Sequence, residues 1–532
     1  MPTLRSSLNY EPKELQFGTS GRRGLIVDLT QLEIYINVSA ELEYLQSLPP
    51  GDGGIKKSDE VYFALDLRPS SPKMCVAVEQ AIADAGMRSV NLGKIPTPAL
   101  MFHALGKQCA SIMVTGSHIP FDRNGYKLNT SRGELLKQHE TPIGAKVAAV
   151  RQRIYEQAFD ESLFNEVGDL RVPPGVSLPV DAAREGYTAR YRDFFSGQGN
   201  LAGRKILVYQ HSAVGRDLLA DILNNLGAEA IPAGRSDTFV PIDTENIDAA
   251  QLDAVQRLAD GHKGLWAVVS TDGDSDRPLI LSVDATGRVK FFGGDLLGMI
   301  VARYLRADAV VVPISCNDAI DRGDLAGVLE PKTRIGSPYV IAGMNAAVAK
   351  GRLAVCGWEA NGGFLLGSDM ERNGRKLTAL ATRDAFLPIL SVLFAANERG
   401  IGLADLFSEL PRRFSKAGLL KNFPRETGLR IVERLTPVKG TGDADEHTRI
   451  ATDLARVFTL ARGFKSVARL DYTDGVRIIF SNNDVAHIRP SGNADELRIY
   501  AAADSQARAD AIVADGVAEP NGILRSLQCL IQ

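Results

Sequence analysis

The apolar positions of this chain recur in one order: a short β-branched run, a polar loop, a segment with apolar residues at helical spacing, a glycine, and a second apolar run. Residues 60–93 ("EVYFALDLRPSSPKMCVAVEQAIADAGMRSVNLG") and residues 204–234 ("RKILVYQHSAVGRDLLADILNNLGAEAIPAG") follow this order, and a weaker copy starts at residue 306 with "RADAVVVPISCNDAIDR". Strands that alternate with amphipathic helices predict mixed or parallel sheets covered by helices. Three similar α/β domains in series are therefore expected, although such units also recur in any large α/β protein.

The C-terminal part of the chain has a different pattern. Residues 468–503 ("ARLDYTDGVRIIFSNNDVAHIRPSGNADELRIYAAA") predict successive antiparallel strands, and Asp474-Gly475 is a hairpin signal. A smaller α+β domain is expected there.

Runs rich in proline and glycine indicate where the domains meet. "GDLRVPPGVSLP" (168–179) separates the first domain from the second, a new helix begins near Gly293, and "KNFPRETGLR" (421–430) opens the last part. The expected domains are 1–170, 171–292, 293–418 and 419–532.

Composition narrows the class of protein. The net charge is −3, so no charge excess favours nucleic acid or an anionic membrane surface. The longest apolar stretch, 387–396, falls short of the ~20 residues of a membrane-spanning helix, and the first residues lack the apolar core of a signal peptide. Five scattered cysteines without a C-x-x-C pair suit a reducing compartment. A multidomain cytoplasmic protein is expected.

The strongest chemical signal is the acidic run in "LWAVVSTDGDSDRPLI". Asp272, Asp274 and Asp276 follow a β-branched strand at alternate positions, from which they can converge on one cation. Carboxylates this close repel one another unless a cation neutralises them, and Mg²⁺ accepts such ligands with room for a phosphate oxygen. An EF-hand is excluded, because its sixth position would be Arg277 and its twelfth Val283. A solvated acidic turn remains the alternative.

A serine in the loop "VTGSHIPFDRNGYKLN" is the candidate phosphoryl carrier. Ser117 follows an apolar strand in a glycine-containing turn, which allows a ligand to approach the backbone closely. His118 is as compatible with a structural role as with ligand binding. The Asn124-Gly125 turn can return Lys127 towards the serine, although a surface role is more usual for an isolated lysine.

Three further glycine-containing loops carry polar groups. "FGTSGRRG" (17–24) offers backbone N–H groups and two guanidinium groups to an anion. "GWEANGGFLLG" (357–367) offers donors and acceptors suited to sugar hydroxyls. "RPSGNADELRIY" (489–500) combines a guanidinium, a hydroxyl and backbone N–H groups, as a phosphate site requires.

Taken in order, these five loops resemble the signatures of the α-D-phosphohexomutase family, which includes phosphoglucomutases, phosphomannomutases and their aminosugar relatives. "TGSHIP" is similar to its phosphoserine loop T-[AG]-S-H-N-P, and "DGDSDR" matches its metal loop in full. "FGTSGRRG" resembles its N-terminal signature, "WEANGG" its sugar loop G-E-x-S-G-[GH], and "RPSGNADELRIY" its phosphate loop R-P-S-G-T-E-P. The resemblance covers nearly the whole chain.

The chain departs from the family pattern mainly outside the serine and metal positions. The departures are Ile119, Trp358, Asn361, Gly363, Asn493, Ala494 and Asp495. They bear on sugar specificity. A sugar loop of the form E-A-N-G-G is similar to that of bacterial phosphomannomutases of polysaccharide synthesis, which favours mannose phosphate.

The resemblance implies three topologically similar α/β domains and a smaller α+β domain around a central cleft. It implies that phosphorylated Ser117 interconverts hexose 6-phosphate and hexose 1-phosphate through a hexose 1,6-bisphosphate, which also serves as activator, with Mg²⁺ as cofactor. The implied catalytic residues are Ser117, His118, Arg23 and Lys127. The implied metal ligands are Asp272, Asp274, Asp276 and a Ser117 oxygen. The implied substrate-binding residues are Glu359, Asn361, Gly362, Arg277, Arg489, Ser491, Gly492, Asn493 and Arg498.

Several alternatives stay open at this point. The enzyme could prefer glucose phosphate or use both hexoses. An acidic loop after a strand also occurs in haloacid-dehalogenase-type phosphotransferases, which phosphorylate an aspartate, but these lack the Ser117 loop. A non-catalytic sugar-phosphate binder would be expected to have lost the serine or the aspartates, and both are present. The oligomeric state is left open.

Overall fold

A computed structural model describes residues 1–532 except 19, 246, 439–442, 492–494 and 532. The chain divides into two compact units. Unit 1 comprises Met1–Val310 and Gly336–Phe407, and unit 2 comprises Val311–Ile335 and Ser408–Gln532. In the described part of the chain, no helix has both the length and the apolar character needed to cross a membrane.

The first sheet of unit 1 has the order β1-β5-β4-β2-β3, with β6 paired to β5. Its strands are β1 (Arg22–Leu25), β2 (Glu60–Leu65), β3 (Arg88–Lys94), β4 (Ala110–Val114), β5 (Arg123–Thr130) and β6 (Gly133–Glu134). Strand β2 lies parallel to both β3 and β4, whereas β5 runs antiparallel to β4 and to β1. The sheet is therefore mixed, as the alternating pattern predicted.

Helices pack around the first sheet and complete its core. They are α1 (Leu4–Ser7), α2 (Gln31–Ser47), α3 (Ser71–Asp84), α4 (Thr97–Gly106) and α5 (Glu140–Tyr155), with 3-10 helices η1 (Pro50–Asp52), η2 (Lys137–His139) and η3 (Phe159–Glu161). Helix α2 packs against α3 and α5 and begins at a side-chain cap from Thr30. Gly86, the glycine predicted after the first helix, has a φ of 74°, which lets the chain turn back into β3.

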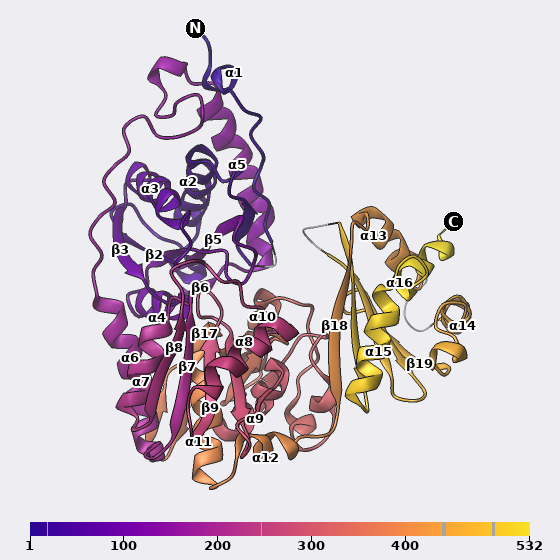
Figure 1. The fold of residues 1–532 in the computed structure, drawn as a ribbon. Coiled ribbons are helices and arrows are strands. Elements are labelled where there is room, and N and C mark those ends of the chain that lie inside the picture. The colour runs from indigo at the N-terminus through magenta and orange to yellow at the C-terminus, as the bar shows by residue number, and fades with distance from the viewer. Residues whose placement is uncertain (19, 246, 439–442, 492–494, 532) are drawn as a thin grey trace. The chain divides into compact units, whose positions relative to one another are not determined.

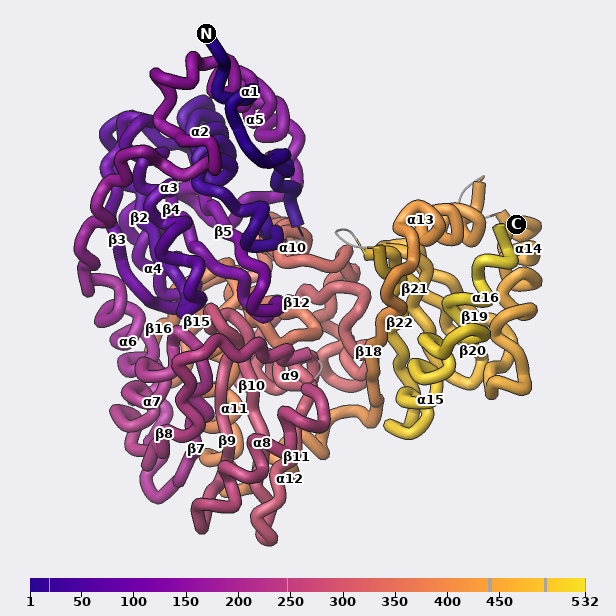
Figure 2. The backbone as a smooth tube through the Cα atoms, turned by 45° about the horizontal axis from the view of Figure 1, so that its top comes forward, coloured from indigo at the N-terminus to yellow at the C-terminus, as the bar shows by residue number. Residues whose placement is uncertain are grey.

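The second sheet, β11-β10-β9-β7-β8, repeats the order of four strands of the first, and differs in that its edge strand β11 follows β10 in sequence whereas β1 precedes β2. Strand β7 lies parallel to β8 and β9, and β10 runs antiparallel to β9. Its elements are β7 (Lys205–His211), β8 (Glu229–Arg235), β9 (Leu265–Thr271), β10 (Pro278–Val283), β11 (Val289–Phe291), α6 (Ala182–Phe195), η4 (Ser196–Gln198), α7 (Arg216–Asn225) and α8 (Ala249–Asp260). Figure 2 shows β7 and β8 side by side, with α7 close to them.

The third sheet has the order β12-β13-β14-β17, beside a two-stranded ribbon, β15-β16. Its elements are β12 (Ala309–Val311), β13 (Val355–Trp358), β14 (Phe364–Leu366), β15 (Met370–Arg372), β16 (Arg375–Leu377), β17 (Leu380–Asp384), α9 (Gly294–Leu305), α10 (Ser337–Ala349), α11 (Phe386–Glu398) and α12 (Leu403–Ser408). Strand β14 is antiparallel to β13 and to β17.

The weaker third copy of the repeat differs from the prediction. After β12 the chain forms two short 3-10 helices, η5 (Asp318–Asp321) and η6 (Asp324–Val328), and the next α-helix begins only at Ser337. Pro313, Gly323 and Pro331 interrupt the apolar pattern there and prevent a longer helix.

Unit 2 contains a five-stranded antiparallel sheet of order β18-β22-β21-β20-β19. Its elements are β18 (Phe414–Lys421), β19 (Val467–Asp471), β20 (Val476–Phe480), β21 (Val485–Pro490), β22 (Glu496–Ala503), α13 (Arg425–Arg434), α14 (Ala444–Ala455), η7 (Leu460–Arg462), α15 (Gln506–Val517), α16 (Ile523–Ser526) and η8 (Leu527–Leu530). Helix α15 packs along β18 and β22 (Figure 1). The predicted hairpin at Asp474-Gly475 joins β19 and β20. The domain boundaries stay a prediction, and the one between 418 and 419 falls inside β18.

Candidate active site

Three of the sequence motifs lie at the same topological place in the three sheets of unit 1. Each fills the loop between a central strand and its antiparallel neighbour: loop 115–122 between β4 and β5, loop 272–277 between β9 and β10, and loop 359–363 between β13 and β14. The repeated connection therefore gives the serine, metal and sugar motifs equivalent positions in their sheets.

Ser117 is fully buried and has a left-handed backbone, with a φ of 52°. Such a conformation is uncommon for a residue with a side chain and points to a surrounding structure that enforces it. The backbone N–H of Ser117 donates to the hydroxyl of Thr115 at 2.7 Å. The Ser117 hydroxyl donates to Asp272 Oδ2 at 2.6 Å, across 155 positions of sequence. The serine loop and the metal loop therefore meet at this hydroxyl.

Arg68 holds the serine loop in this shape. Its guanidinium group donates to three backbone carbonyls of the loop, those of Ser117, Ile119 and Pro120, and to the carbonyl of Arg123 at the start of β5. It also pairs with Asp66 at 3.3 Å and stacks on the Phe239 ring, with 3.8 Å to the ring centroid. A Cβ at Gly116 would lie 2.6 Å from this guanidinium, so the loop needs glycine there.

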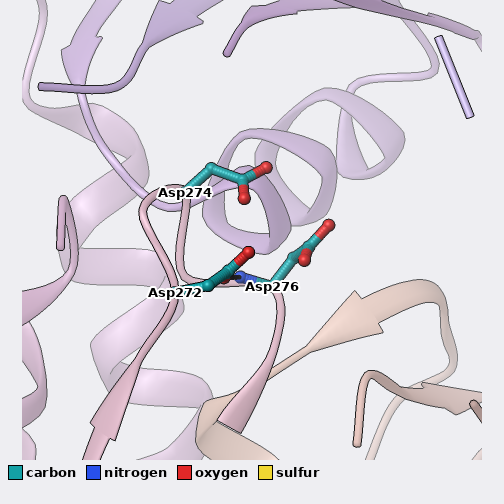
Figure 3. Close-up of side chains that lie close together, drawn as sticks. All are labelled: Asp272, Asp274 and Asp276. Carbon is teal, nitrogen blue, oxygen red and sulfur yellow. Dashed lines mark hydrogen bonds between the residues drawn. The ribbon is translucent and has the colours of Figure 1, made fainter. Parts of the chain in front are cut away.

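The three aspartates leave the metal loop side by side, as Figure 3 shows, and all are buried. One carboxylate oxygen from each lies within 4.8 Å of the other two. Asp272 Oδ1 accepts the backbone N–H groups of Asp276 and Arg277, both at 3.1 Å, which closes the loop on itself. The other oxygen of Asp272 faces Ser117.

Asp274 and Asp276 each accept hydrogen bonds from neighbouring side chains through one carboxylate oxygen, Oδ2. Lys127 Nζ donates to Oδ2 of both, at 2.8 and 2.7 Å, and Thr97 also donates to Asp274 Oδ2, at 2.6 Å. Oδ1 of each is buried and accepts no hydrogen bond within the described residues. Asp276 Oδ1 lies 3.6 Å from Arg277 Nε, an ion pair without a hydrogen bond. Buried carboxylate oxygens that accept no hydrogen bond are costly. Together with the oxygens at Asp272 and Ser117 they fit a hard divalent cation.

The crowding of charged groups shifts the pKa values of the aspartates. Burial and the neighbouring carboxylates of Asp274 and Asp276 raise the pKa of Asp272 well above its usual range. Burial also acts on Asp276, but Arg383 and Lys127 outweigh it and hold the pKa of Asp276 below its usual range. The three aspartates are thus held in different charge environments.

Cations surround the same place. Burial and the nearby guanidinium groups of Arg277 and Arg383 lower the pKa of Arg23 to about 10. Burial, Arg277 and Arg23 lower the pKa of His118 well below its usual value, so the imidazole is neutral at neutral pH. His118 Nδ1 lies 3.5 Å from the Ser117 hydroxyl. Arg277 and Arg383 pair with Asp276, and the guanidinium of Arg23 adds further positive charge beside them, which favours binding of a negatively charged ligand.

The sugar motif forms a tight turn. The backbone N–H of Gly362 donates to the carbonyl of Glu359 at 2.9 Å, and the side chain of Asn361 accepts from Gly363 N–H at 2.9 Å. A Cβ at Gly294 would lie 2.2 Å from Gly362 N, so helix α9 starts directly against this turn. Trp358, a departure from the family pattern, is buried and packs over Gly298 of α9.

Arg383 is a site residue that the sequence analysis missed. Its Nε donates to Asp276 Oδ2 and its Nη1 to Glu359 Oε2, both at 3.0 Å, so it joins the metal loop to the sugar loop. Arg68 and Thr97 were missed as well. None of the three lies in a recognisable motif; only the polar loop "LDLRPSS" after the first predicted strand pointed to Arg68.

The predicted phosphate loop lies in unit 2. Arg489 and Arg498 are directly opposite each other on β21 and β22. Arg489 pairs with Asp474 at 3.0 Å, and Arg498 with Glu496 at 3.3 Å. Ser491 is buried, and its N–H donates to the Glu496 carbonyl. Two of the predicted residues, Gly492 and Asn493, lie outside the described residues.

Two sheets that share the order of four strands, a third related to them, and a serine that meets an aspartate triad define a multidomain α/β protein with a candidate phosphoryl-transfer centre. Models of the phosphoglucomutase/phosphomannomutase family match the chain as α/β/α domain I at residues 14–153, α/β/α domain III at 293–414 and the C-terminal domain at 425–519. The chain belongs to this family, also known as the α-D-phosphohexomutases. Its membership confirms the resemblance and argues against the aspartate-phosphorylating superfamily.

Individual proteins that are similar to this chain support the same family. The chain is 38% identical over 501 residues to a phosphomannomutase of Salmonella muenchen, covering 94% of each chain. It is 37% identical over 507 residues to a phosphomannomutase of Sinorhizobium fredii, covering 95% of this chain and 98% of that one. A crystal structure of a phosphoglucomutase/phosphomannomutase family protein from Burkholderia thailandensis superimposes with a TM-score of 0.65 at 17% identity, covering 96% of this chain and 97% of that chain, which supports the fold.

Proposed function

We propose that this chain interconverts the 6-phosphate and the 1-phosphate of a hexose, with mannose phosphate preferred, through a hexose 1,6-bisphosphate. The observation that carries the proposal is the 2.6 Å contact between the Ser117 hydroxyl and Asp272, beside two buried carboxylate oxygens without hydrogen-bond partners. The preference for mannose is supported by the two phosphomannomutases at 37% and 38% identity.

Ser117 is the proposed carrier. In the forward step the bond between phosphorus and Ser117 Oγ breaks, and a bond forms between phosphorus and the free hydroxyl oxygen of the hexose phosphate. The proton of that hydroxyl passes to a base of the site, and Ser117 Oγ takes up a proton from an acid of the site as it leaves. In the return step the other phosphate of the bisphosphate moves to Ser117 Oγ. Hexose 1,6-bisphosphate acts as activator, because it phosphorylates an empty serine.

The aspartates are the proposed Mg²⁺ ligands. Asp272 Oδ2, Asp274 Oδ1 and Asp276 Oδ1 would hold the ion together with an oxygen at Ser117. When bound, Mg²⁺ supplies positive charge to the transferring phosphoryl group. Lys127 donates to Oδ2 of both Asp274 and Asp276, which leaves Oδ1 of each for the ion.

Four groups near the serine have proposed roles in charge and proton handling. Arg23 and Arg277 would neutralise phosphoryl oxygens, and Lys127 and the neutral His118 are the candidates for moving the hydroxyl proton. The preceding contacts support these assignments without ranking the two candidates.

Recognition of the substrate is proposed to be divided between two loops. Glu359, Asn361 and Gly362 would hold sugar hydroxyls. The phosphate that is not transferred would be held by Arg489, Ser491, Gly492, Asn493 and Arg498. Arg489 and Arg498 lie opposite each other on adjacent antiparallel strands, so both side chains are on one face of the sheet, where two guanidinium groups can bind one phosphate.

Five free cysteines support a cytoplasmic location. The direct test of function is a coupled assay of the purified chain with mannose 1-phosphate, glucose 1-phosphate and glucosamine 1-phosphate, each with Mg²⁺ and the matching bisphosphate. The highest kcat/KM is expected with mannose 1-phosphate. Turnover of none of the three would contradict the proposal, and a higher value for glucose would correct the preference.

The division of labour is tested by two variants. Arg489→Ala removes a charged donor worth about 1.5–3 kcal/mol, so kcat/KM should fall roughly 10- to 150-fold, equally for mannose and glucose phosphates. Asn361→Ala should change the ratio of the two kcat/KM values, because it leaves a hydroxyl of one sugar unpaired. A changed ratio in Arg489→Ala with an unchanged ratio in Asn361→Ala would reverse the assignment.

A further inference from the structure

Three consecutive residues at the end of β17 each reach a different part of unit 1. Thr382 donates to Glu134 Oε1 of β6 at 2.7 Å. Arg383 reaches the metal loop and the sugar loop. Asp384 accepts hydrogen bonds from two tyrosines of α6, Tyr187 at 2.8 Å and Tyr191. The end of this strand therefore meets all three sheets and the helix that follows the first domain.

The neighbours of Arg383 fix its backbone on both sides. Glu134 also accepts from Ser337 at 2.8 Å, which ties the first sheet to the start of α10 as well as to Thr382. Asp384 accepts the N–H of Phe386 at 2.9 Å in addition to the two tyrosines. With hydrogen bonds on either side, the guanidinium group has little freedom to move relative to the two loops.

The bridge made by Arg383 depends on the shape of its side chain. Nε and Nη1 donate to different carboxylates, each at 3.0 Å, and the side chain is 3% exposed. A planar guanidinium can present two N–H groups to two separate acids, whereas an ammonium group is a single point of charge. Lysine at this position would keep the charge but could not span both carboxylates in the same way.

Each bond also decides which carboxylate oxygen is left over. Arg383 and Lys127 occupy Asp276 Oδ2, which leaves Oδ1 in the cation site. On the sugar loop, Arg383 takes Glu359 Oε2, and no hydrogen bond to Oε1 is found among the described residues. One guanidinium thus orients a carboxylate of the metal loop and the acid of the sugar loop.

We infer that Arg383 is a positioning residue that couples the sugar loop to the metal loop, so that the contacts of Glu359 influence the binding of a divalent cation at Asp276. This inference rests on the proposed function for the roles of the two loops. While Glu359 shares the guanidinium, Asp276 keeps more of its negative charge for the cation. When the Glu359 carboxylate is removed, as in Glu359→Gln, the guanidinium interacts with Asp276 alone and competes with the cation.

A double-mutant cycle measures this coupling through Mg²⁺ affinity, without any turnover. Titration calorimetry gives the Mg²⁺ dissociation constant of the wild type, Glu359→Gln, Arg383→Lys and the double variant. Glu359→Gln should weaken Mg²⁺ binding about three- to tenfold in the presence of Arg383, and less than about twofold in the Arg383→Lys background. Equal weakening in both backgrounds means that Glu359 acts by direct Coulomb attraction, which overturns the inference.

Two controls separate coupling from general damage. Arg190→Lys replaces another buried arginine of unit 1, which donates to the hydroxyl and the carbonyl of Thr378, and should leave the effect of Glu359→Gln unchanged. If Arg383→Lys does not fold, as judged by circular dichroism, the cycle is repeated with Arg383→Gln, for which the same loss of coupling is expected. Failure of wild-type turnover in the coupled assay would contradict the proposed function alone, because Mg²⁺ binding is measured independently.

Discussion

The serine loop and the metal loop occupy the same place in two sheets that share the order of four strands, yet they are held in different ways. Loop 115–122 is held from outside, because the Arg68 side chain binds three of its carbonyls and the carbonyl of Arg123 that follows it. Loop 272–277 holds itself, because Asp272 accepts the N–H groups of Asp276 and Arg277, and its own N–H donates to the Arg277 carbonyl at 3.1 Å. The longer loop is held by a side chain from outside the loop, whereas the shorter loop is held by hydrogen bonds between its own residues.

This difference shows how one fold position serves two kinds of chemistry. The short loop uses its backbone to fix three acids, and one oxygen of each stays near the others. The long loop places a single hydroxyl, and Arg68 keeps that hydroxyl against Asp272. The topology brings the loops together, and the supports decide what each presents.

Among the changes that test this comparison, removal of the Ser117 hydroxyl should lower mutase activity most. Ser117→Ala deletes the proposed carrier while leaving the metal loop intact, so mutase activity should fall on the order of 10³-fold or more. Intact-mass analysis of the wild type should show a phosphorylated fraction, and peptide mapping should place it on Ser117. Ser111→Ala, which removes another buried serine of the same domain, is the control for packing effects. Wild-type turnover in Ser117→Ala would end the carrier assignment.

Neutralising one acid of the metal loop should have the next largest effect. Asp274→Asn removes a charge from the cation site while Lys127 keeps its bond to Asp276, so activity at fixed Mg²⁺ should fall about 100-fold or more. Chelation should abolish the activity of the wild type, and added Mg²⁺ should restore it. Asp284→Asn, at an exposed position of the same domain, should change neither property. Full activity of Asp274→Asn, or activity that survives exhaustive chelation, would contradict the metal assignment.

A substitution of Arg68 tests whether the serine loop depends on the contacts of its guanidinium group. Arg68→Lys keeps a positive charge but lacks the planar fork, so kcat should fall about 10- to 100-fold as the hydroxyl loses its position. The Mg²⁺ affinity should change little, because the metal loop is closed by its own backbone. Arg151→Lys replaces a buried arginine that pairs with Glu33 in the same domain, and should affect stability without lowering kcat. Unchanged kcat in Arg68→Lys would show that the serine loop does not need the guanidinium contacts of Arg68.

The smallest expected effect concerns pH and the strand that leads into the metal loop. His211 Nε2 donates to the carbonyl of Thr271 at 2.8 Å, and burial lowers the pKa of His211 to about 4. Below about pH 6.5 the unfolded chain therefore binds a proton that the folded chain does not. The free energy of unfolding should fall as pH decreases, by about 2 kcal/mol between pH 7 and pH 5.

Urea unfolding at these two pH values tests the histidine. Both tryptophans, Trp266 and Trp358, lie in unit 1, so their fluorescence reports the unit that contains His211. His211→Gln should lose this part of the pH dependence, while His262→Gln, at an exposed position, should retain it. Identical pH dependence in wild type and His211→Gln would show that His211 does not titrate with folding.

The sequence by itself determined the local features of this protein. The alternation of apolar runs predicted the strands and helices of the first two domains, because burial of one face imposes a period on the residues that form it. The acidic run and the serine turn identified the two reacting loops, because their chemistry is carried by residues close together in sequence. The third copy was predicted less well, since proline and glycine interrupted its pattern.

Only the tertiary structure decided how these features meet. The Ser117–Asp272 contact spans 155 positions, and the Arg383–Asp276 contact spans 107. Arg68 and Arg383 stand outside every motif, and their roles depend on strand order and on the loops that packing brings within reach. A side chain's local sequence fixes what it can bind, but burial among groups from distant strands fixes what it does bind, and that is set by the whole fold.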